Sequence, residues 1–382
     1  MRRWSVLLAG TFVLAAQAGA ISGLAVLAPE FRDHYDLSLT EIGVLLGVSS
    51  IGALLTLLAW GLAADRIGER TTAAVGMLGA SAALTGAAYA TAFAPLVALL
   101  FLMAAFAASA NTATARAVTS WFARNERGFA LGVRQTAVPI GGFTAALALP
   151  PIDDAWGLRT AMLVIAGAVL AAAIVAATLM VEGPIRTVDD ETDALRHPVR
   201  DRRIWRIASA SSLLIVTQIV LTGFVVLFLE SQRGFSHGAA GAVLAGMNVV
   251  AIAGRLVGGR LSDRRDSRVG LILRIAVATA VSVGISAALV GGPDWLLCVA
   301  LVVGGGLSMS WNGLAVAATV ETVGPGRAGA ALGVQQTMLQ AAVVAAPLAF
   351  APFISATSWG AGFAVAAVFP LAGAHVLQRL RR

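Results

Sequence analysis

GLAADRIGER (61–70) and GRLSDRRDSR (259–268) decide the fold, because one pattern of glycine, acid and arginine stands twice in a chain of 382 residues. Another stretch repeats in the same order: LGVRQT (131–136) recurs as LGVQQT (332–337), 201 residues later. The offset of 201 residues also relates Gln17 to Gln218, Asn111 to Asn312 and Gly128 to Gly329. Several matches in one order indicate a duplicated unit.

The composition is that of a membrane protein. Hydrophobic residues make up 58% of the chain, the mean hydropathy is +0.84, and only 12% of residues are charged. Soluble domains carry about 25% charged residues. A membrane-spanning helix needs about 20 mostly apolar residues, and twelve such stretches follow one another. They lie at 4–28, 42–62, 72–92, 95–119, 129–151, 158–181, 204–229, 239–259, 270–290, 296–320, 330–350 and 358–378.

The repeat divides these spans into two groups of six. Residues 1–181 and 204–382 are the two predicted bundles, and the charged segment 182–203 between them is a predicted cytoplasmic linker. Six spans return the chain to its starting side, so the two copies are parallel repeats about an axis normal to the membrane. The predicted fold is therefore an all-α integral membrane protein of twelve transmembrane helices in two six-helix bundles.

The arginines predict the orientation. Most of the 27 basic residues, all of them arginine, fall in the segments that share a side with both termini. Positive loops stay inside, so we expect both termini in the cytoplasm and the protein in the cell membrane. A cleavable signal peptide is the alternative for the first span. Its apolar run of about 25 residues and its counterpart in the second half favour a retained helix.

Several classes of function are disfavoured by what the sequence lacks. Without lysine the chain has neither a P-loop nor a Schiff-base site. Cys298 is its single cysteine, and the four histidines lack metal-ligand spacing, so we expect no disulfide, metal or cofactor. The arginines flank apolar spans and do not form a nucleic-acid surface. We therefore expect neither an enzyme nor a nucleic-acid partner. The predicted partners are a small solute and the lipid bilayer, and the predicted functional form is a monomer.

The two opening stretches bring a family into view. GLAADRIGER resembles the G-x-x-x-D-R-x-G-R-R/K signature of the major facilitator superfamily, and GRLSDRRDSR resembles its degenerate second copy. Residues 120–142 are loosely similar to the cyanate and nitroimidazole transporter-like branch. Glu69 departs from the signature, which has a basic residue there. The resemblance implies two bundles flanking a central site that opens alternately to either side.

The resemblance also implies a role for the signature loops. Such aspartates cap helix N-termini of the other bundle and form salt bridges in the outward-open state, and negative charge at a helix N-terminus stabilises it by about 0.3–1 kcal/mol. The alternative is that these charges serve only to orient the chain. The predicted gating residues are Gly61, Asp65, Arg66, Gly68, Arg70, Gly259, Asp263 and Arg264.

Polar residues inside the spans are the candidates for solute binding. Arg134 corresponds to the neutral Gln335 in the repeat, so one half has a charge that the fold of the other half does without. Charges within spans are costly and often mark a transport path, whereas amides there often bond between helices. The predicted solute contacts are Gln17, Asn111, Arg134, Gln218, Asn248, Trp311, Asn312, Gln336 and Gln340. The sequence leaves open whether Arg116 and Arg255 are structural.

The acidic residues narrow the class of solute. No Asp or Glu lies deep in a predicted span, and Glu321 lies at the cytoplasmic end of one. A cavity with arginine and amides but no carboxylate attracts anions. The sequence therefore predicts a secondary transporter of a small anionic or polar organic solute. An exporter of neutral amphiphilic compounds and a non-transporting receptor are the alternatives. Proton coupling, through Glu321 or the solute itself, stays open, as do the direction and the solute's identity.

Overall fold

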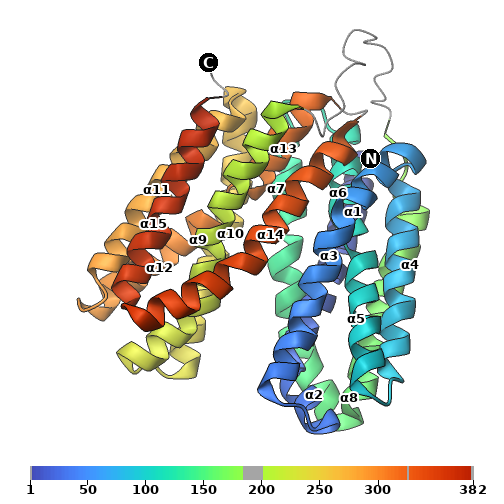
Figure 1. Cartoon of the computed structure of the whole chain (residues 1–382). Helices are drawn as coiled ribbons and strands as arrows, with labels where there is room; N and C mark the ends of the chain where they lie inside the picture. Colours follow the sequence, from blue (N-terminus) through green and yellow to red (C-terminus); the bar gives the residue numbers. More distant parts are fainter. Residues whose placement is uncertain (1, 184–200, 325–326, 380–382) are drawn as a thin grey trace. The chain divides into compact units, whose positions relative to one another are not determined.

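A computed structural model describes residues 2–183, 201–324 and 327–379, so most of the predicted linker 182–203 lies outside the described residues. The described chain is helical and contains no strand. The helices (Figure 1) are α1 (Arg2–Val26), α2 (Ala28–Tyr35), α3 (Leu39–Ile67), α4 (Glu69–Ala88), α5 (Phe93–Ala107), α6 (Ser109–Trp121), α7 (Arg127–Gln135), α8 (Ala137–Leu179), α9 (Arg202–Arg233), α10 (His237–Arg265), α11 (Arg268–Ala288), α12 (Asp294–Ser308), α13 (Asn312–Val323), α14 (Ala328–Ala356) and α15 (Trp359–Gln378).

The described helices provide the predicted twelve spans. Eleven segments are long and apolar enough to cross a membrane, and one of them, Arg127–Leu179, has 53 residues. A straight helix of that length would measure about 80 Å against a hydrocarbon core of about 30 Å. Gly157 interrupts it with φ 78° and ψ 165°, a conformation that glycine adopts without steric cost. The segment therefore supplies two spans, close to the predicted 129–151 and 158–181.

Two of the spans are broken at corresponding places in the repeat. The fourth span consists of α5 and α6, which meet at Ala108, and the tenth consists of α12 and α13, separated by residues 309–311. Ala108 and Met309 are 201 residues apart, which is the offset read from the sequence. A break frees backbone groups that other side chains must satisfy inside a membrane. In the break between α12 and α13, the Met309 carbonyl is such a group, and it accepts a hydrogen bond from Arg255.

Several helices begin at a capping side chain. The Ser38 hydroxyl accepts a hydrogen bond from the Glu41 amide, and the Glu41 carboxylate accepts one from the Ser38 amide at 2.9 Å. Ser236 and Ser358 cap α10 and α15 in the same way, without the reciprocal acid. Such caps satisfy amides that have no partner within their helix. They fix where the spans start at their polar ends.

The described residues form two compact units. Unit 1 takes those of Met1–Ala123, Val133–Pro198 and Val323–Thr337, and unit 2 takes those of Arg124–Gly132, Val199–Thr322 and Met338–Arg382. Each unit therefore includes a short segment from the other half of the sequence repeat. Segment 124–132 belongs to unit 2 although it comes from the first half, and segment 323–337 belongs to unit 1 although it comes from the second.

Unit 1 is built around α1, α4 and α8. Helix α1 packs along α8 and α6, and α4 packs along α8 and α5. Met77, Leu100 and Val169 are fully buried in this core. A Cβ atom on Gly141 would lie 2.8 Å from the backbone nitrogen of Gly19. The two backbones thus meet closely, as small residues allow in membrane bundles.

Unit 2 has two hydrophobic cores. One contains Phe228, Trp359 and Phe363, with the rings of Phe228 and Phe363 edge to face at a centroid distance of 5.0 Å. The other surrounds Trp311, whose side chain is 1% exposed, with apolar residues of α9, α11, α13 and α15. Edge-to-face aromatic pairs add to the stabilisation from buried area. These cores hold α9 and α13 in place, and both helices present candidate solute contacts.

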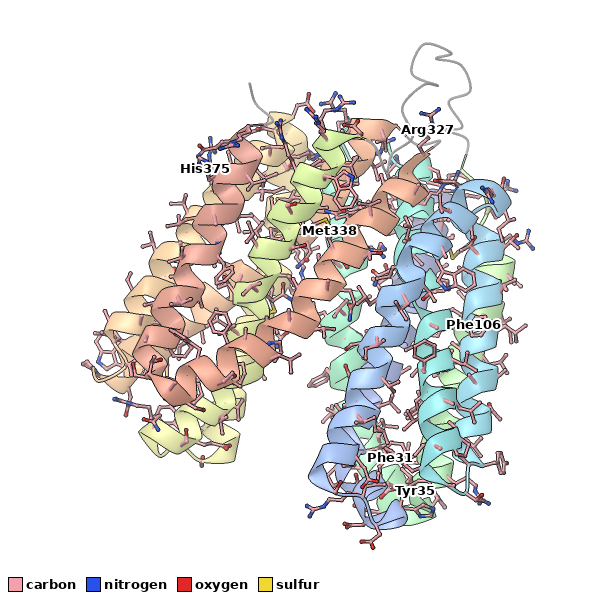
Figure 2. The ribbon with its side chains drawn as sticks, in the orientation of Figure 1. Phe31, Tyr35, Phe106, Arg327, Met338 and His375 are labelled. Atoms are coloured by element: carbon pink, nitrogen blue, oxygen red, sulfur yellow. The ribbon has the colours of Figure 1, made fainter. Side chains whose placement is uncertain are left out.

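A clamp at corresponding positions holds one loop in each unit. In unit 1 the Tyr35 hydroxyl (Figure 2) donates to the carbonyl of Ala90 at 2.8 Å. In unit 2 Arg233, 198 residues after Tyr35, donates to the carbonyls of Val290 and Gly292 and pairs with Asp294. Burial raises the pKa of the Tyr35 hydroxyl, although a nearby arginine partly offsets the rise, so the hydroxyl keeps its donor proton.

Candidate functional site: a buried arginine and two aspartate latches

Arg134 lies fully buried in unit 1, at the end of α7. Its Nε donates to the Thr114 hydroxyl at 2.8 Å, and its Nη2 donates to the backbone carbonyl of Asn111 at 2.6 Å. A longer contact of 3.4 Å joins Nη2 to the Asn111 side-chain oxygen. Every acceptor is neutral. Nη1 has no hydrogen-bond partner among the described residues. The structure thus joins two predicted solute contacts, Asn111 and Arg134.

In unit 2 a different arginine, Arg255, binds at the break between α12 and α13. Gln335, the repeat counterpart of Arg134, is 1% exposed. Arg255 of α10 donates from Nε to the carbonyl of Met309 at 3.0 Å, and its side chain is 5% exposed. This contact gives Arg255 a structural part, because it satisfies a carbonyl freed by the break between α12 and α13.

Four of the predicted solute contacts in unit 2, three amides and Trp311, fall into a pair and two separate residues. Asn312, the first residue of α13, donates to the Gln218 side-chain oxygen at 3.2 Å, which links two repeat-related candidates. Asn248 donates to the Leu244 carbonyl of its own helix at 2.9 Å. The Trp311 indole donates to the Ser308 carbonyl and lies in the core. Of these four, the half-buried Gln218 and Asn312 are arranged as a polar pair.

The remaining predicted contacts are placed by burial alone. Gln17 is 6% exposed on α1, and Gln336 and Gln340 are half-buried on α14. Their roles stay predictions. Among the described residues, no group of three or more His, Cys, Asp or Glu side chains is arranged to hold a metal ion.

Asp65 forms a latch within unit 1. Its two carboxylate oxygens accept hydrogen bonds from the backbone amides of Gly329 and Ala330, at 2.9 and 2.7 Å. Both amides belong to segment 323–337. Gly61, one helical turn before Asp65, allows the approach, because a Cβ atom on Gly61 would lie 3.0 Å from the Cα of Gly333. A carboxylate with two amide donors at a helix start is a favourable arrangement.

An ion-pair network supports Asp65 from within the first half. Arg116 of α6 lies 3.3 Å from Asp65 through Nε and 2.5 Å from Glu69 through Nη1. The Glu69 side chain is 3% exposed and also accepts from the Ser120 hydroxyl at 3.1 Å. Arg116 therefore has acidic partners and a structural place. Glu69, the departure from the family signature, is the partner that balances it.

Asp263 forms the corresponding latch within unit 2. Its oxygens accept from the backbone amides of Gly128 and Phe129, both at 2.9 Å. These amides belong to segment 124–132, and Gly128 is the repeat counterpart of Gly329. Gly259 lies close to this segment, since its Cβ atom would be 2.8 Å from the Cα of Phe129. The two signature loops thus make the same contact with opposite halves of the sequence.

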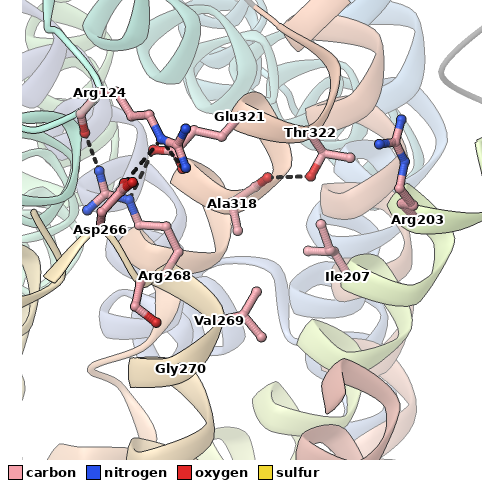
Figure 3. A pocket seen from close by; sticks show the side chains of 11 residues that line it. Arg124, Arg203, Ile207, Asp266, Arg268, Val269, Gly270, Ala318, Glu321 and Thr322 are labelled. Atoms are coloured by element: carbon pink, nitrogen blue, oxygen red, sulfur yellow. Dashed lines mark hydrogen bonds and ion pairs between the residues drawn. The ribbon is translucent and has the colours of Figure 1, made fainter. Parts of the chain in front are cut away.

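Arg268 is the hub of the network in unit 2. Its Nη1 lies 2.5 Å from Asp263, and its Nε donates to Glu321 at 3.0 Å. It also donates to the backbone carbonyl of Arg124 in segment 124–132. The Arg124 side chain lies 3.2 Å from Asp266 and 3.6 Å from Glu321. These groups line one side of a cavity of about 400 Å³ (Figure 3), with Ile207 and Val269 among its apolar residues.

Some of the predicted gating residues make the latch contacts, and others are exposed to the surroundings. Asp65, Gly61, Asp263 and Gly259 make the contacts described above. Arg66, Arg70 and Arg264 are exposed, and Gly68 ends α3 with φ 81°. The sequence prediction placed Arg268 in the second signature loop without a role of its own, and it did not include Arg124 or the amide donors at 128–129 and 329–330. The repeat held one signal for them, because Gly128 and Gly329 correspond.

The model of the Major Facilitator Superfamily matches residues 7–347. The chain belongs to this superfamily. An uncharacterized MFS-type transporter of Mycobacterium tuberculosis (strain CDC 1551 / Oshkosh) is 33% identical over 376 residues, 97% of this chain and 83% of that protein.

Two further relatives and a solved structure are similar to the chain. A probable nitrate/nitrite transporter of the same strain is 27% identical over 50% of each chain. A probable sulfoacetate transporter of Cupriavidus necator is 24% identical over 70% of this chain and 66% of that protein. A proton:xylose symporter structure shares 14% identity, covers 99% of this chain and 95% of that one, and has a TM-score of 0.80.

These findings confirm the coarse predictions. The protein is a multi-pass membrane transporter with the twelve-helix fold of its superfamily, and it is not an enzyme. The looser similarity of residues 120–142 to the cyanate and nitroimidazole transporter-like branch stays a prediction.

Proposed function

We propose that this transporter moves a small anionic or polar organic solute by alternating access, and that it prefers anionic solutes to neutral ones. The observation that supports it is Arg134, a fully buried guanidinium whose three contacts are all to neutral oxygens. A charge buried without a counter-charge is costly in a membrane protein. An anionic solute supplies that counter-charge at the moment of binding.

The other polar groups of the spans agree with this class of solute. Asn111 in unit 1 and the Gln218–Asn312 pair in unit 2 are neutral donors and acceptors that suit the hydroxyl or amide groups of a solute. Two relatives named for a substrate, nitrate/nitrite and sulfoacetate, are named for anions. Gln17, Asn248, Trp311, Gln336 and Gln340 complete the proposed set.

The two aspartate latches are the proposed cytoplasmic gate. Asp65 and Asp263 each hold amides from the opposite half of the sequence. Releasing both would let 1–181 and 204–382 move as the two bundles of an alternating-access cycle. The arginine distribution supports placing the latches and both termini on the cytoplasmic side of the cell membrane.

Flux into proteoliposomes tests the function. Purified protein would be offered small monocarboxylates, sulfonates and neutral polar solutes, beside Arg134→Gln and the matched control Arg274→Gln, which changes an exposed arginine on α11. We expect anion flux in the wild type and the control, and at least a tenfold loss in Arg134→Gln. Flux of neutral amphiphiles without any anion flux would overturn the proposal in favour of a neutral-compound exporter.

A further inference from the structure

The guanidinium of Arg134 is only partly satisfied by its surroundings. Nε is taken by Thr114 and Nη2 by the Asn111 carbonyl, both at short distances, whereas Nη1 is buried and without a partner among the described residues. The contact from Nη2 to the Asn111 side-chain oxygen is long, at 3.4 Å. The weakest contact therefore lies on Nη2, and the free donors lie on Nη1. These two nitrogens form one edge of the guanidinium.

That edge has the geometry that a carboxylate or sulfonate prefers. Two parallel N–H groups of an arginine bind two oxygens of one anionic group, and such charge-assisted bonds are about twice as strong as neutral ones. A neutral amide oxygen now occupies one of the two acceptor positions, loosely. A solute oxyanion would displace it and gain both Nη1 and Nη2. The half-buried Asn111 would then turn its amide group to a donor or acceptor elsewhere on the solute.

Unit 1 offers one buried arginine without an acidic partner among its described contacts, which suits a solute with a single negative charge. Arg116 is the other arginine of the predicted fourth and fifth spans, on α6, and it already pairs with Asp65 and Glu69. A second negative group on the solute would find no uncompensated arginine beside Arg134 among the described contacts of unit 1. The neutral amides suit uncharged parts of the solute.

We propose that the Asn111 side-chain oxygen is a neutral placeholder on Arg134, and that a single carboxylate or sulfonate of a monoanionic solute displaces it to bind Nη1 and Nη2. This inference rests on the proposed function, because it assigns the solute's charged group and its subsite. It makes a prediction that a structural role for Arg134 does not make. A carboxylate side chain at residue 111 will bind Arg134 in place of the solute.

The variants Asn111→Asp and Asn111→Ala separate the two roles. Asn111→Asp places a charged oxygen where the placeholder stands, so we expect the melting temperature to rise by about 2 °C or more and the affinity for monoanions to fall at least tenfold. Asn111→Ala removes the placeholder together with the amide contact to the solute, so its affinity for monoanions is expected to fall less than that of Asn111→Asp. A purely structural Arg134 predicts that Asn111→Asp transports normally and that Asn111→Ala is the damaged variant.

The measurement uses ligand-induced thermal shifts and flux with acetate, methanesulfonate and gluconate as monoanions, malonate as a dianion, and acetamide as a neutral isostere. We expect stabilisation of the wild type by at least one monoanion and by neither malonate nor acetamide. The rise in melting temperature from Asn111→Asp should vanish in the Arg134→Gln background. A rise that persists there, or malonate binding as well as the monoanions, overturns the inference.

The outcomes also separate this inference from the function on which it rests. A wild type that carries anions, with Asn111→Asp carrying them equally well, refutes the placeholder and leaves anion transport standing. A wild type that neither binds nor carries any anion of the panel refutes both the subsite and the proposed class of solute.

Discussion

Each aspartate latch has an arginine–glutamate ion pair beside it, and the helices that supply the arginine and the glutamate are exchanged between the two units. In unit 1 the supporting arginine comes from α6, as Arg116, and the buried acid is Glu69, the first residue of α4. In unit 2 the arginine is the first residue of α11, Arg268, and the acid comes from α13, as Glu321. The aspartate stays the same in both, with two backbone amides and one arginine around it. The difference teaches that the latch requires a balanced ion pair beside the aspartate, and either helix can supply either sign.

A second difference is the kind of contact that holds the segment taken from the other half of the sequence. In unit 1, Asp65 holds segment 323–337 through two backbone amides. Segment 124–132 is held in unit 2 by Asp263, by the bond from Arg268 to the Arg124 carbonyl, and by stacking of Arg260 on the Phe129 ring at 4.3 Å. The pair between Arg124 and Asp266 is exposed and adds little. The unit 2 latch should therefore tolerate the loss of one contact better.

The largest effect is expected from breaking the ion pair between Glu69 and Arg116 in unit 1. Glu69→Arg would place two guanidinium groups together where Glu69 is 3% exposed, and removing one partner of a buried pair costs about 3–5 kcal/mol. We expect a marked fall in melting temperature and loss of most flux. The double variant Glu69→Arg with Arg116→Glu restores the pair with the polarity found in unit 2, and should recover more than half of the stability.

Thermal unfolding in detergent and flux in proteoliposomes measure this prediction. Arg274→Glu, on the exposed face of α11, is the matched charge-reversal control and should shift the melting temperature little. A double variant no more stable than Glu69→Arg alone would show that the sign of each charge is fixed by its position. It would contradict the conclusion that either helix can supply either charge.

The second prediction compares the aspartates themselves. Asp65→Asn and Asp263→Asn each keep the side-chain size but remove charge from two amide contacts, and a hydrogen bond to a charged group contributes about 1.5–3 kcal/mol. We expect initial flux to fall about tenfold in Asp65→Asn and about threefold in Asp263→Asn, because the additional ties of unit 2 remain. Equal losses, measured per reconstituted protein, would contradict the asymmetry.

The sequence predicted the fold better than it predicted the network. Hydropathy and the offset repeat define spans and duplication, because each span must be apolar along its whole length. The charge partners were harder to see. Glu69 stood out as a departure from the signature, but its partner did not, since Arg116 lies 47 residues away and only packing brings the two together. The breaks at Ala108 and at 309–311 left no proline or charge in the sequence to mark them. Arg134 was found from its unequal repeat partner, and its neutral surroundings emerged only from the fold.

The smallest effects are expected at the clamps on the opposite ends of the units. Tyr35→Phe removes one hydrogen bond to the Ala90 carbonyl, a loss of about 1 kcal/mol. Arg233→Gln removes contacts to two carbonyls and to Asp294, so its melting temperature should fall further than that of Tyr35→Phe. Each clamp lies within one unit and touches neither latch, so flux per folded protein should change less than twofold in both variants. A loss of flux as large as that of Asp65→Asn, at unchanged melting temperature, would show that these loops take part in the transport cycle.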